Sequence, residues 1–118
     1  MAMNIPLVFQ TYQWDAGKRH FSMIPNSDFV SQVTAWANPT DTILVTCRSG
    51  GRSAAAVNQL AATGFTNVYD ILDGMEGDTV NDRESVFHGK RMKNGWKNSG
   101  LPWTYDLDPE RMQLPERQ

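Results

Sequence analysis

The sequence predicts an α/β fold in which parallel strands are joined through a helix. Residues 42–46 are apolar and β-branched, a composition typical of a strand buried on both faces of a parallel sheet. An alanine-rich stretch over residues 53–63, closed by Gly64, predicts a helix that lies close on that sheet. Residues 65–72 supply a second strand. Together these elements predict one β-loop-α-β unit with a right-handed crossover.

Composition and charge are typical of a single folded domain. Of the 118 residues, 40% are hydrophobic and 10% are aromatic, which is enough apolar surface for one core. A net charge of −2 predicts no overall attraction to nucleic acid or to an anionic membrane. No apolar run approaches the ~18 residues of a membrane helix. The first residues carry no secretory signal, so the cytoplasm is the default expectation.

The chain before this unit contains three predicted segments. Residues 4–9 form an apolar run interrupted by Pro6, which predicts a short edge strand. Residues 10–25 mix polar and aromatic side chains without a period, which predicts an ordered loop. Helical spacing over residues 26–38 predicts a helix with an apolar, core-facing stripe. The members of that stripe are Phe29, Val30, Val33, Trp36 and Ala37.

The chain after this unit turns polar. Residues 73–95 are rich in glycine and charge, which predicts a long loop of the kind that often covers a site. Residues 96–103 predict a short terminal helix. Residues 104–118 are expected to wrap the surface or to fray.

The only cysteine, Cys47, directly follows the first strand of the unit. One thiol excludes an intramolecular disulfide and a cysteine-based zinc cluster. The carboxyl end of a parallel strand and the start of the next helix form the usual ligand crevice of α/β folds. Backbone N–H groups and the helix dipole there favour the thiolate, which is the nucleophilic form. We therefore interpret Cys47 as a covalent nucleophile rather than a packed core residue.

The next six residues are the candidate substrate-binding residues. Two adjacent glycines among them permit a tight loop. Arg48 and Arg52 are candidates for binding the anionic end of a substrate, although Arg52 can instead pin the loop through a carboxylate or carbonyl. Ser53 can hydrogen-bond the sulfur or cap the helix. The full set is Arg48, Ser49, Gly50, Gly51, Arg52 and Ser53.

The sequence from Cys47 to Ser53, CRSGGRS, is similar to the active-site loop of rhodanese-like sulfurtransferases. Three later segments resemble, in order and spacing, those that follow the loop in single-domain members of that family. These segments are 64–68 (GFTNV), 72–78 (LDGMEGD) and 95–103 (GWKNSGLPW).

The resemblance implies a three-layer domain over residues 1–103 with a mostly parallel central sheet, followed by a tail over residues 104–118. Residues 2–6 resemble a strand that comes, in this family, after a helix, an Asp-Val-Arg strand and a Gly-His turn, which are absent here. A strand beside residues 42–46 is therefore expected to be missing, which leaves backbone groups unpaired. Either the chain is a truncated or separately encoded piece, or the sheet is rearranged, with a homodimer formed by strand exchange as one route.

The resemblance also implies a two-step sulfur transfer. The Cys47 thiolate would take the outer sulfur of a small anionic donor such as thiosulfate and release sulfite. The persulfide would then give that sulfur to cyanide, to a small thiol or to a sulfur-accepting protein. No metal or organic cofactor is implied.

Two other classes stay open. A cysteine phosphatase or arsenate reductase also attacks an oxyanion from a strand–helix loop, but its loop is longer than the four residues that Cys47 and Arg52 enclose. A non-catalytic rhodanese-like module that binds a partner, or an inactive fragment, is the third class. His20 and His88 have no metal-ligand spacing, so no metal site is predicted.

Overall fold

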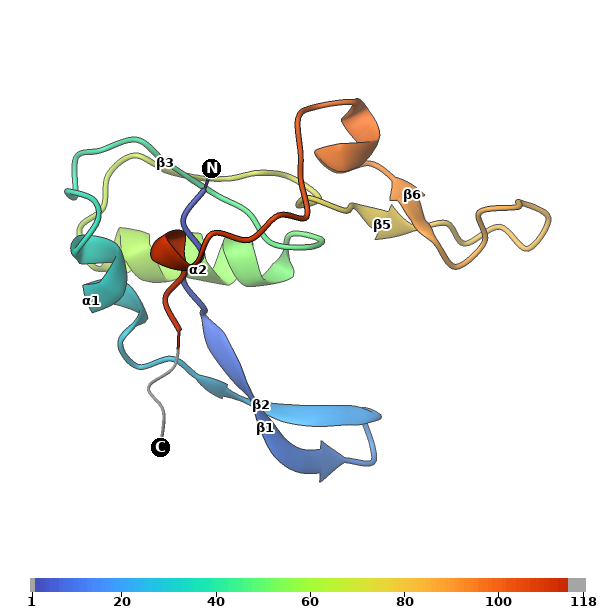
Figure 1. Cartoon of the computed structure of the whole chain (residues 1–118), viewed down its shortest axis with the longest axis horizontal. Helices are drawn as coiled ribbons and strands as arrows, with labels where there is room; N and C mark the ends of the chain where they lie inside the picture. Colours follow the sequence, from blue (N-terminus) through green and yellow to red (C-terminus); the bar gives the residue numbers. More distant parts are fainter. Residues whose placement is uncertain (1, 115–118) are drawn as a thin grey trace. The chain divides into compact units, whose positions relative to one another are not determined.

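The computed structural model describes residues 2–114, which form two compact units (Figure 1). One unit comprises residues 2–37 together with 107–114, and the other is Asn38–Asp106. Each unit is built from elements close in sequence, apart from the C-terminal segment of the first. The last part of the segment that was expected to wrap or fray, residues 115–118, lies outside the described residues.

The first unit begins with an antiparallel hairpin of β1 (Val8–Asp15) and β2 (His20–Pro25). The prediction of a loop over residues 10–25 is therefore wrong. Trp14 and Phe21 face each other across the strands, with ring centroids 5.3 Å apart in an edge-to-face arrangement. Such cross-strand aromatic pairs stabilise a hairpin.

Exposure explains why this hairpin has no strand pattern in the sequence. Tyr12 is 98% exposed, and both faces of β1 and β2 carry exposed residues, so apolar and polar positions do not alternate. The turn is fixed locally instead. The Asp15 side chain accepts from the N–H of Lys18 at 3.1 Å, and its carbonyl accepts from the N–H of Arg19 at 2.8 Å.

The helix of this unit, α1 (Phe29–Thr34), is shorter than the predicted range 26–38. Phe29 and Val33 are buried, as predicted. Trp36 lies beyond the helix in a tight turn and is 57% exposed, so its expected place in the core is wrong. In this turn the Val33 carbonyl accepts from the N–H groups of both Trp36 and Ala37, so the helical ladder ends on one shared acceptor.

The two ends of the described chain pair within this unit. Asn4 donates to the carbonyl of Arg111 at 2.7 Å and accepts from the N–H of Gln113 at 2.8 Å. The single predicted strand over residues 4–9 is thus divided into an isolated bridge at Asn4 and the start of β1. Beside the bridge lies the short 3₁₀ helix η2 (Pro109–Arg111).

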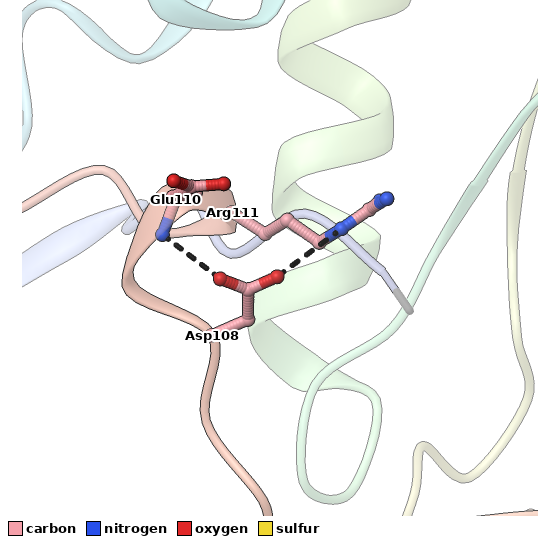
Figure 2. Close-up of polar contacts among 3 residues, drawn as sticks. All are labelled: Asp108, Glu110 and Arg111. Carbon is pink, nitrogen blue, oxygen red and sulfur yellow. Dashed lines mark hydrogen bonds and ion pairs between the residues drawn. The ribbon is translucent and has the colours of Figure 1, made fainter.

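The helix η2 is held by the carboxylate of Asp108 (Figure 2). One oxygen accepts from the N–H of Glu110 at 3.1 Å, and the other lies 3.5 Å from the Nε of Arg111. The first contact is an N-terminal cap, and the second is an exposed ion pair of small energetic value. Residues 108–113 of the predicted tail are therefore held by local capping and by pairing with Asn4.

The second unit contains the predicted β-loop-α-β unit. Strands β3 (Ile43–Val45) and β4 (Val68–Asp70) pair in parallel and are joined by α2 (Gly51–Ala62). Val45 and Asp70 are register partners, and the Ile71 N–H continues the ladder to the Val45 carbonyl at 2.9 Å. The predicted order and parallel pairing of these elements are confirmed.

The core of this unit lies between α2 and one face of the β3–β4 pair. Its buried apolar side chains are those of Ala56, Leu60 and Phe65. On the other face, the register partners Leu44 and Tyr69 are 64% and 54% exposed. The prediction that the first strand is buried on both faces is therefore wrong, because α2 covers only one of them.

The remaining elements of the second unit are short. Within residues 73–95, predicted as a loop, β5 (Asp78–Thr79) pairs antiparallel with β6 (Arg91–Lys93). The predicted terminal helix is reduced to the 3₁₀ turn η1 (Lys97–Ser99). The described residues thus hold three two-stranded sheets, one parallel and two antiparallel. The α/β content is mixed, and the expected mostly parallel central sheet is not confirmed.

Candidate active site around Cys47

Cys47 lies two residues after β3, at the end of the strand that faces the start of α2. Its side chain is half-buried. The N–H groups of Gly50 and Ser53 point at Sγ, at 3.2 and 3.4 Å. Gly50 caps α2 with a φ of 110°, a left-handed conformation that favours glycine and turns its N–H toward the sulfur. The first turn of α2 and the loop before it therefore form a cradle of donors around one atom.

This cradle changes the acidity of the thiol. Burial alone raises the pKa of Cys47, because it penalises the charged thiolate. Hydrogen bonds outweigh burial: the Ser53 side chain when it donates to the sulfur, and the backbone N–H groups of Ser53, Gly50 and Ser49. The net result lowers the pKa of Cys47 from 9.0 to about 7. A large fraction of the thiol is then ionised at neutral pH, as a nucleophilic cysteine requires.

Ser53 is the most buried polar residue of the site, with 2% of its surface exposed. Its Oγ lies 3.4 Å from Cys47 Sγ, 3.0 Å from the Gly50 carbonyl oxygen and 2.6 Å from Asp70 Oδ1. Asp70 is the last residue of β4, and the parallel register brings the carboxyl ends of β3 and β4 together. The sequence interpretation did not include Asp70. The available signal was a carboxylate in the second predicted strand, which pairs with the strand that precedes Cys47.

The loop is also fixed from the side of the chain after β4. The N–H groups of Met75 and Glu76 donate to the carbonyls of Cys47 and Arg48, at 2.7 and 2.8 Å. Met75 in turn accepts from the N–H of Lys97 at 2.9 Å. Backbone hydrogen bonds from the residues after β4 therefore fix the conformation of the Cys47 loop.

Arg48 directly follows Cys47, Arg52 is the second residue of α2, and both residues are exposed. Neither side chain makes a hydrogen bond or ion pair with any residue in the range 2–114 that the structure describes. The alternative in which Arg52 pins the loop through a carboxylate or carbonyl thus has no support among these residues. Both guanidinium groups are available to an anion.

Of the other candidate binding residues, Ser49 and Gly50 are half-buried, whereas Gly51 is exposed at the first position of α2. His20 and His88 are exposed and lie in different units. Within residues 2–114, no group of three or more His, Cys, Asp or Glu side chains is arranged to hold a metal ion. None of the helices described there is long and apolar enough to cross a membrane.

The family is decided by a match over most of the chain. Residues 2–79, which include β3, the Cys47 loop, α2 and β4, match the model of the rhodanese-like domain. The chain belongs to the rhodanese-like domain family. Within this rhodanese-like domain, Cys47 lies at the end of β3 in the loop that the sequence resemblance singled out.

Individual relatives match parts of the chain. The chain is 36% identical over 72 residues to thiosulfate sulfurtransferase 18 of Arabidopsis thaliana, which covers 61% of this chain and 47% of that protein. It is 46% identical over 52 residues to the chloroplastic thiosulfate sulfurtransferase 16 of the same plant, a match that covers 44% of this chain and 43% of that protein. It is 38% identical over 63 residues to the uncharacterized protein RP600 of Rickettsia prowazekii, a match that covers 53% of this chain and 42% of that protein. The chain thus spans less than half the length of these relatives.

Proposed function

We propose that this rhodanese-like domain is a sulfurtransferase that carries a sulfane sulfur on Cys47. The observation that carries the proposal is the pair of N–H groups, from Gly50 and Ser53, aimed at Cys47 Sγ. Such donors stabilise negative charge on sulfur, first on the thiolate and then on the persulfide. The names of two relatives, both thiosulfate sulfurtransferases, support the same activity.

The first half-reaction loads the enzyme. The Cys47 thiolate attacks the outer sulfur of thiosulfate, a new S–S bond forms at Sγ, and the S–S bond of thiosulfate breaks. The bonding pair of that bond leaves with sulfite. The lowered pKa of Cys47, about 7, favours this step because the attacking group is already ionised at neutral pH.

The second half-reaction transfers the outer sulfur of the Cys47 persulfide to an acceptor. A thiolate or cyanide acceptor attacks the terminal sulfur of the persulfide and takes it as a new persulfide or as thiocyanate. The electron pair of the broken bond returns to Cys47 Sγ, so the thiolate is regenerated and a ping-pong cycle is complete.

The exposed arginines supply the expected contact with the donor. Arg48 directly follows Cys47, Arg52 lies in the first turn of α2, and their side chains make no hydrogen bond or ion pair with the described residues. A guanidinium group offers paired N–H donors that match the oxygens of a sulfonate-like group. We infer that these two residues bind the sulfite end of thiosulfate while its outer sulfur faces Cys47.

The test is an intact-mass spectrum after incubation with thiosulfate and desalting, run beside the Cys47→Ser variant. Gain of one sulfur atom, its loss on cyanide treatment and its absence in the variant are the expected results. Circular dichroism on both proteins verifies that they are folded.

A folded wild-type protein that gains no sulfur would contradict the proposal. Release of phosphate from an aryl phosphate, dependent on Cys47, would then favour an oxyanion hydrolase. Absence of both reactions would favour a binding module of this family.

A further inference from the structure

Three polar atoms lie within hydrogen-bond distance of Ser53 Oγ, which has a single O–H to donate. Cys47 Sγ is 3.4 Å from Ser53 Oγ, the Gly50 carbonyl oxygen is 3.0 Å away, and Asp70 Oδ1 is 2.6 Å away. A serine hydroxyl donates a single hydrogen bond and accepts through its lone pairs. Which acceptor receives the proton therefore decides what Ser53 presents to the sulfur.

Distance and charge both favour Asp70. The 2.6 Å separation falls within the about 2.5–2.7 Å range of charge-assisted O–H···O⁻ bonds, which are roughly twice as strong as neutral ones. The carbonyl of Gly50 is neutral, and the sulfur is the most distant of the three acceptors. Ser53 is 2% exposed, so water does not compete for its hydroxyl.

We propose that Asp70 is a positioning residue that accepts the hydrogen bond of the Ser53 hydroxyl, so that the Ser53 oxygen turns a lone pair, not its O–H, toward Cys47 Sγ. In this arrangement Ser53 Oγ accepts the S–H bond of the neutral thiol, and the thiolate is stabilised by the backbone N–H groups of Gly50 and Ser53. The role of Asp70 in sulfur transfer rests on the proposed function, but its effect on the thiol does not.

The proposal makes the effect of Ser53 depend on residue 70. With Asp70 present, the Ser53 hydroxyl supports the neutral thiol. With Asn at position 70, an amide N–H can donate to Ser53 Oγ, which frees the hydroxyl proton for the sulfur and removes a negative charge nearby. Both changes favour the thiolate.

The other charged groups on the elements packed around the thiol do not share this network. Arg48 and Arg52 flank the loop, and Asp73 and Glu76 lie in the segment after β4. No hydrogen bond or ion pair within residues 2–114 joins their side chains to Cys47, Ser53 or Asp70. They are kept constant in every variant.

The experiment measures the rate of Cys47 alkylation by iodoacetamide against pH, without any sulfur donor. Cys47 is the only cysteine, so the rate reports one thiol. The proteins are the wild type, Ser53→Ala, Asp70→Asn and the double variant. Glu84→Gln is the matched control, because it removes one carboxylate from an exposed position whose side chain makes no hydrogen bond with the described residues.

Asp70→Asn is expected to move the midpoint of the pH–rate profile for alkylation about one pH unit lower. The variant lacks the negative charge of the carboxylate and adds an amide N–H that can donate to Ser53 Oγ. Ser53→Ala is expected to leave the midpoint unchanged or to lower it in the wild-type background, and to raise it in the Asp70→Asn background. A merely structural role for Asp70 would not make the effect of Ser53→Ala on the midpoint depend on residue 70 in this way. Glu84→Gln keeps the wild-type midpoint.

The opposite result overturns the proposal. If Ser53→Ala raises the midpoint in the wild-type background, Ser53 donates to the sulfur despite Asp70. The midpoint of Ser53→Ala in the wild-type background tests the proposal even if circular dichroism shows that Asp70→Asn does not fold. Because alkylation needs no persulfide, a failed sulfur-loading experiment and a failed alkylation experiment are separate outcomes.

Discussion

The backbone N–H of Met75 donates to the carbonyl oxygen of Cys47 at 2.7 Å. This bond ties the loop that carries the thiol to the chain that follows β4. Gly74, just before it, lies so close that a Cβ at this position would stand 2.5 Å from the same carbonyl oxygen. The shape of the Cys47 loop therefore depends on a segment 26 to 28 residues further along the chain as well as on its own glycines.

Gly74→Ala is expected to destabilise the protein and to slow alkylation of Cys47. Its φ of +66° costs an alanine about 1–2 kcal/mol, and the clash with the Cys47 carbonyl adds to that cost. Gly89→Ala is the matched control, because Gly89 has a φ of +76° and nothing within 4 Å of a Cβ. Urea unfolding and alkylation rates compare the two. An equal loss of stability in both variants, with equal alkylation, would contradict the close contact.

The midpoint of the pH–rate profile of Cys47 alkylation is expected to lie below that of a free thiol, because the backbone N–H groups of Gly50 and Ser53 lower the pKa of Cys47. Below the Cys47 midpoint the thiol binds a proton and loses nucleophilicity, so the rate falls about tenfold per pH unit; above it the rate levels off. A free cysteine derivative measured in parallel gives a midpoint near its ordinary pKa of about 8.5. Coincidence of the two profiles would show that the donors around Sγ do not act on the thiol.

Gly50→Ala is expected to raise the pKa of Cys47. An alanine cannot adopt the φ of +110° without strain, so the N–H that stands 3.2 Å from Sγ moves away. Gly64→Ala is the control at the other end of α2, since Gly64 has a φ of +103° and makes no hydrogen bond to the sulfur. Both variants lose stability in a thermal melt, but only Gly50→Ala shifts the alkylation profile to higher pH. A shift in both would assign the effect to general loosening of α2.

Charge selectivity tests the two arginines. Arg48→Gln and Arg52→Gln are each expected to lower the ratio of the alkylation rates with anionic iodoacetate and neutral iodoacetamide, because each removes a cation beside the thiol. Under thiosulfate loading the same variants should need a higher donor concentration. Arg83→Gln removes an exposed cation elsewhere and controls for net charge. An identical ratio in all three variants would argue against anion binding at Arg48 and Arg52.

Leu60→Ala tests the core under the site. Leu60 is 1% exposed on α2, and truncation of a buried leucine costs about 2–5 kcal/mol in free energy of unfolding. Leu72→Ala, at a position 80% exposed, is the control and should cost far less. Urea denaturation monitored by tryptophan fluorescence measures both. Equal midpoints would mean that α2 does not hold its unit together.

The β-loop-α-β unit was predictable because the composition of each of its segments indicates the secondary structure of that segment. Residues 42–46 and 65–72 have the composition of strands. Residues 53–63 are rich in alanine and are followed by Gly64, as is typical of a helix and its C-terminal cap. The Cys47 loop was predictable for the same reason, since strand end, glycines and helix start follow one another directly.

The elements that were missed depend on contacts distant in sequence or on exposed faces. The hairpin of β1 and β2 has no buried face to impose alternation, and Trp14 meets Phe21 only once the strands pair. Asp70 reaches Ser53 because of the parallel register of β3 and β4, which no single stretch of sequence specifies. The shortness of α1 follows from a turn at Trp36 in a stretch whose spacing is still helical.

The pairing of Asn4 with the backbone of Arg111 and Gln113 has a consequence for the order of folding. The contacts that build the β3–α2–β4 core of Asn38–Asp106 join residues that are close in sequence, so this core can form while the unit at the N-terminus still lacks its last partner. Closure of so long a loop is entropically costly and slow. The unit at the N-terminus is thus completed last, and the cradle around Cys47 can be in place before the two ends of the described chain meet.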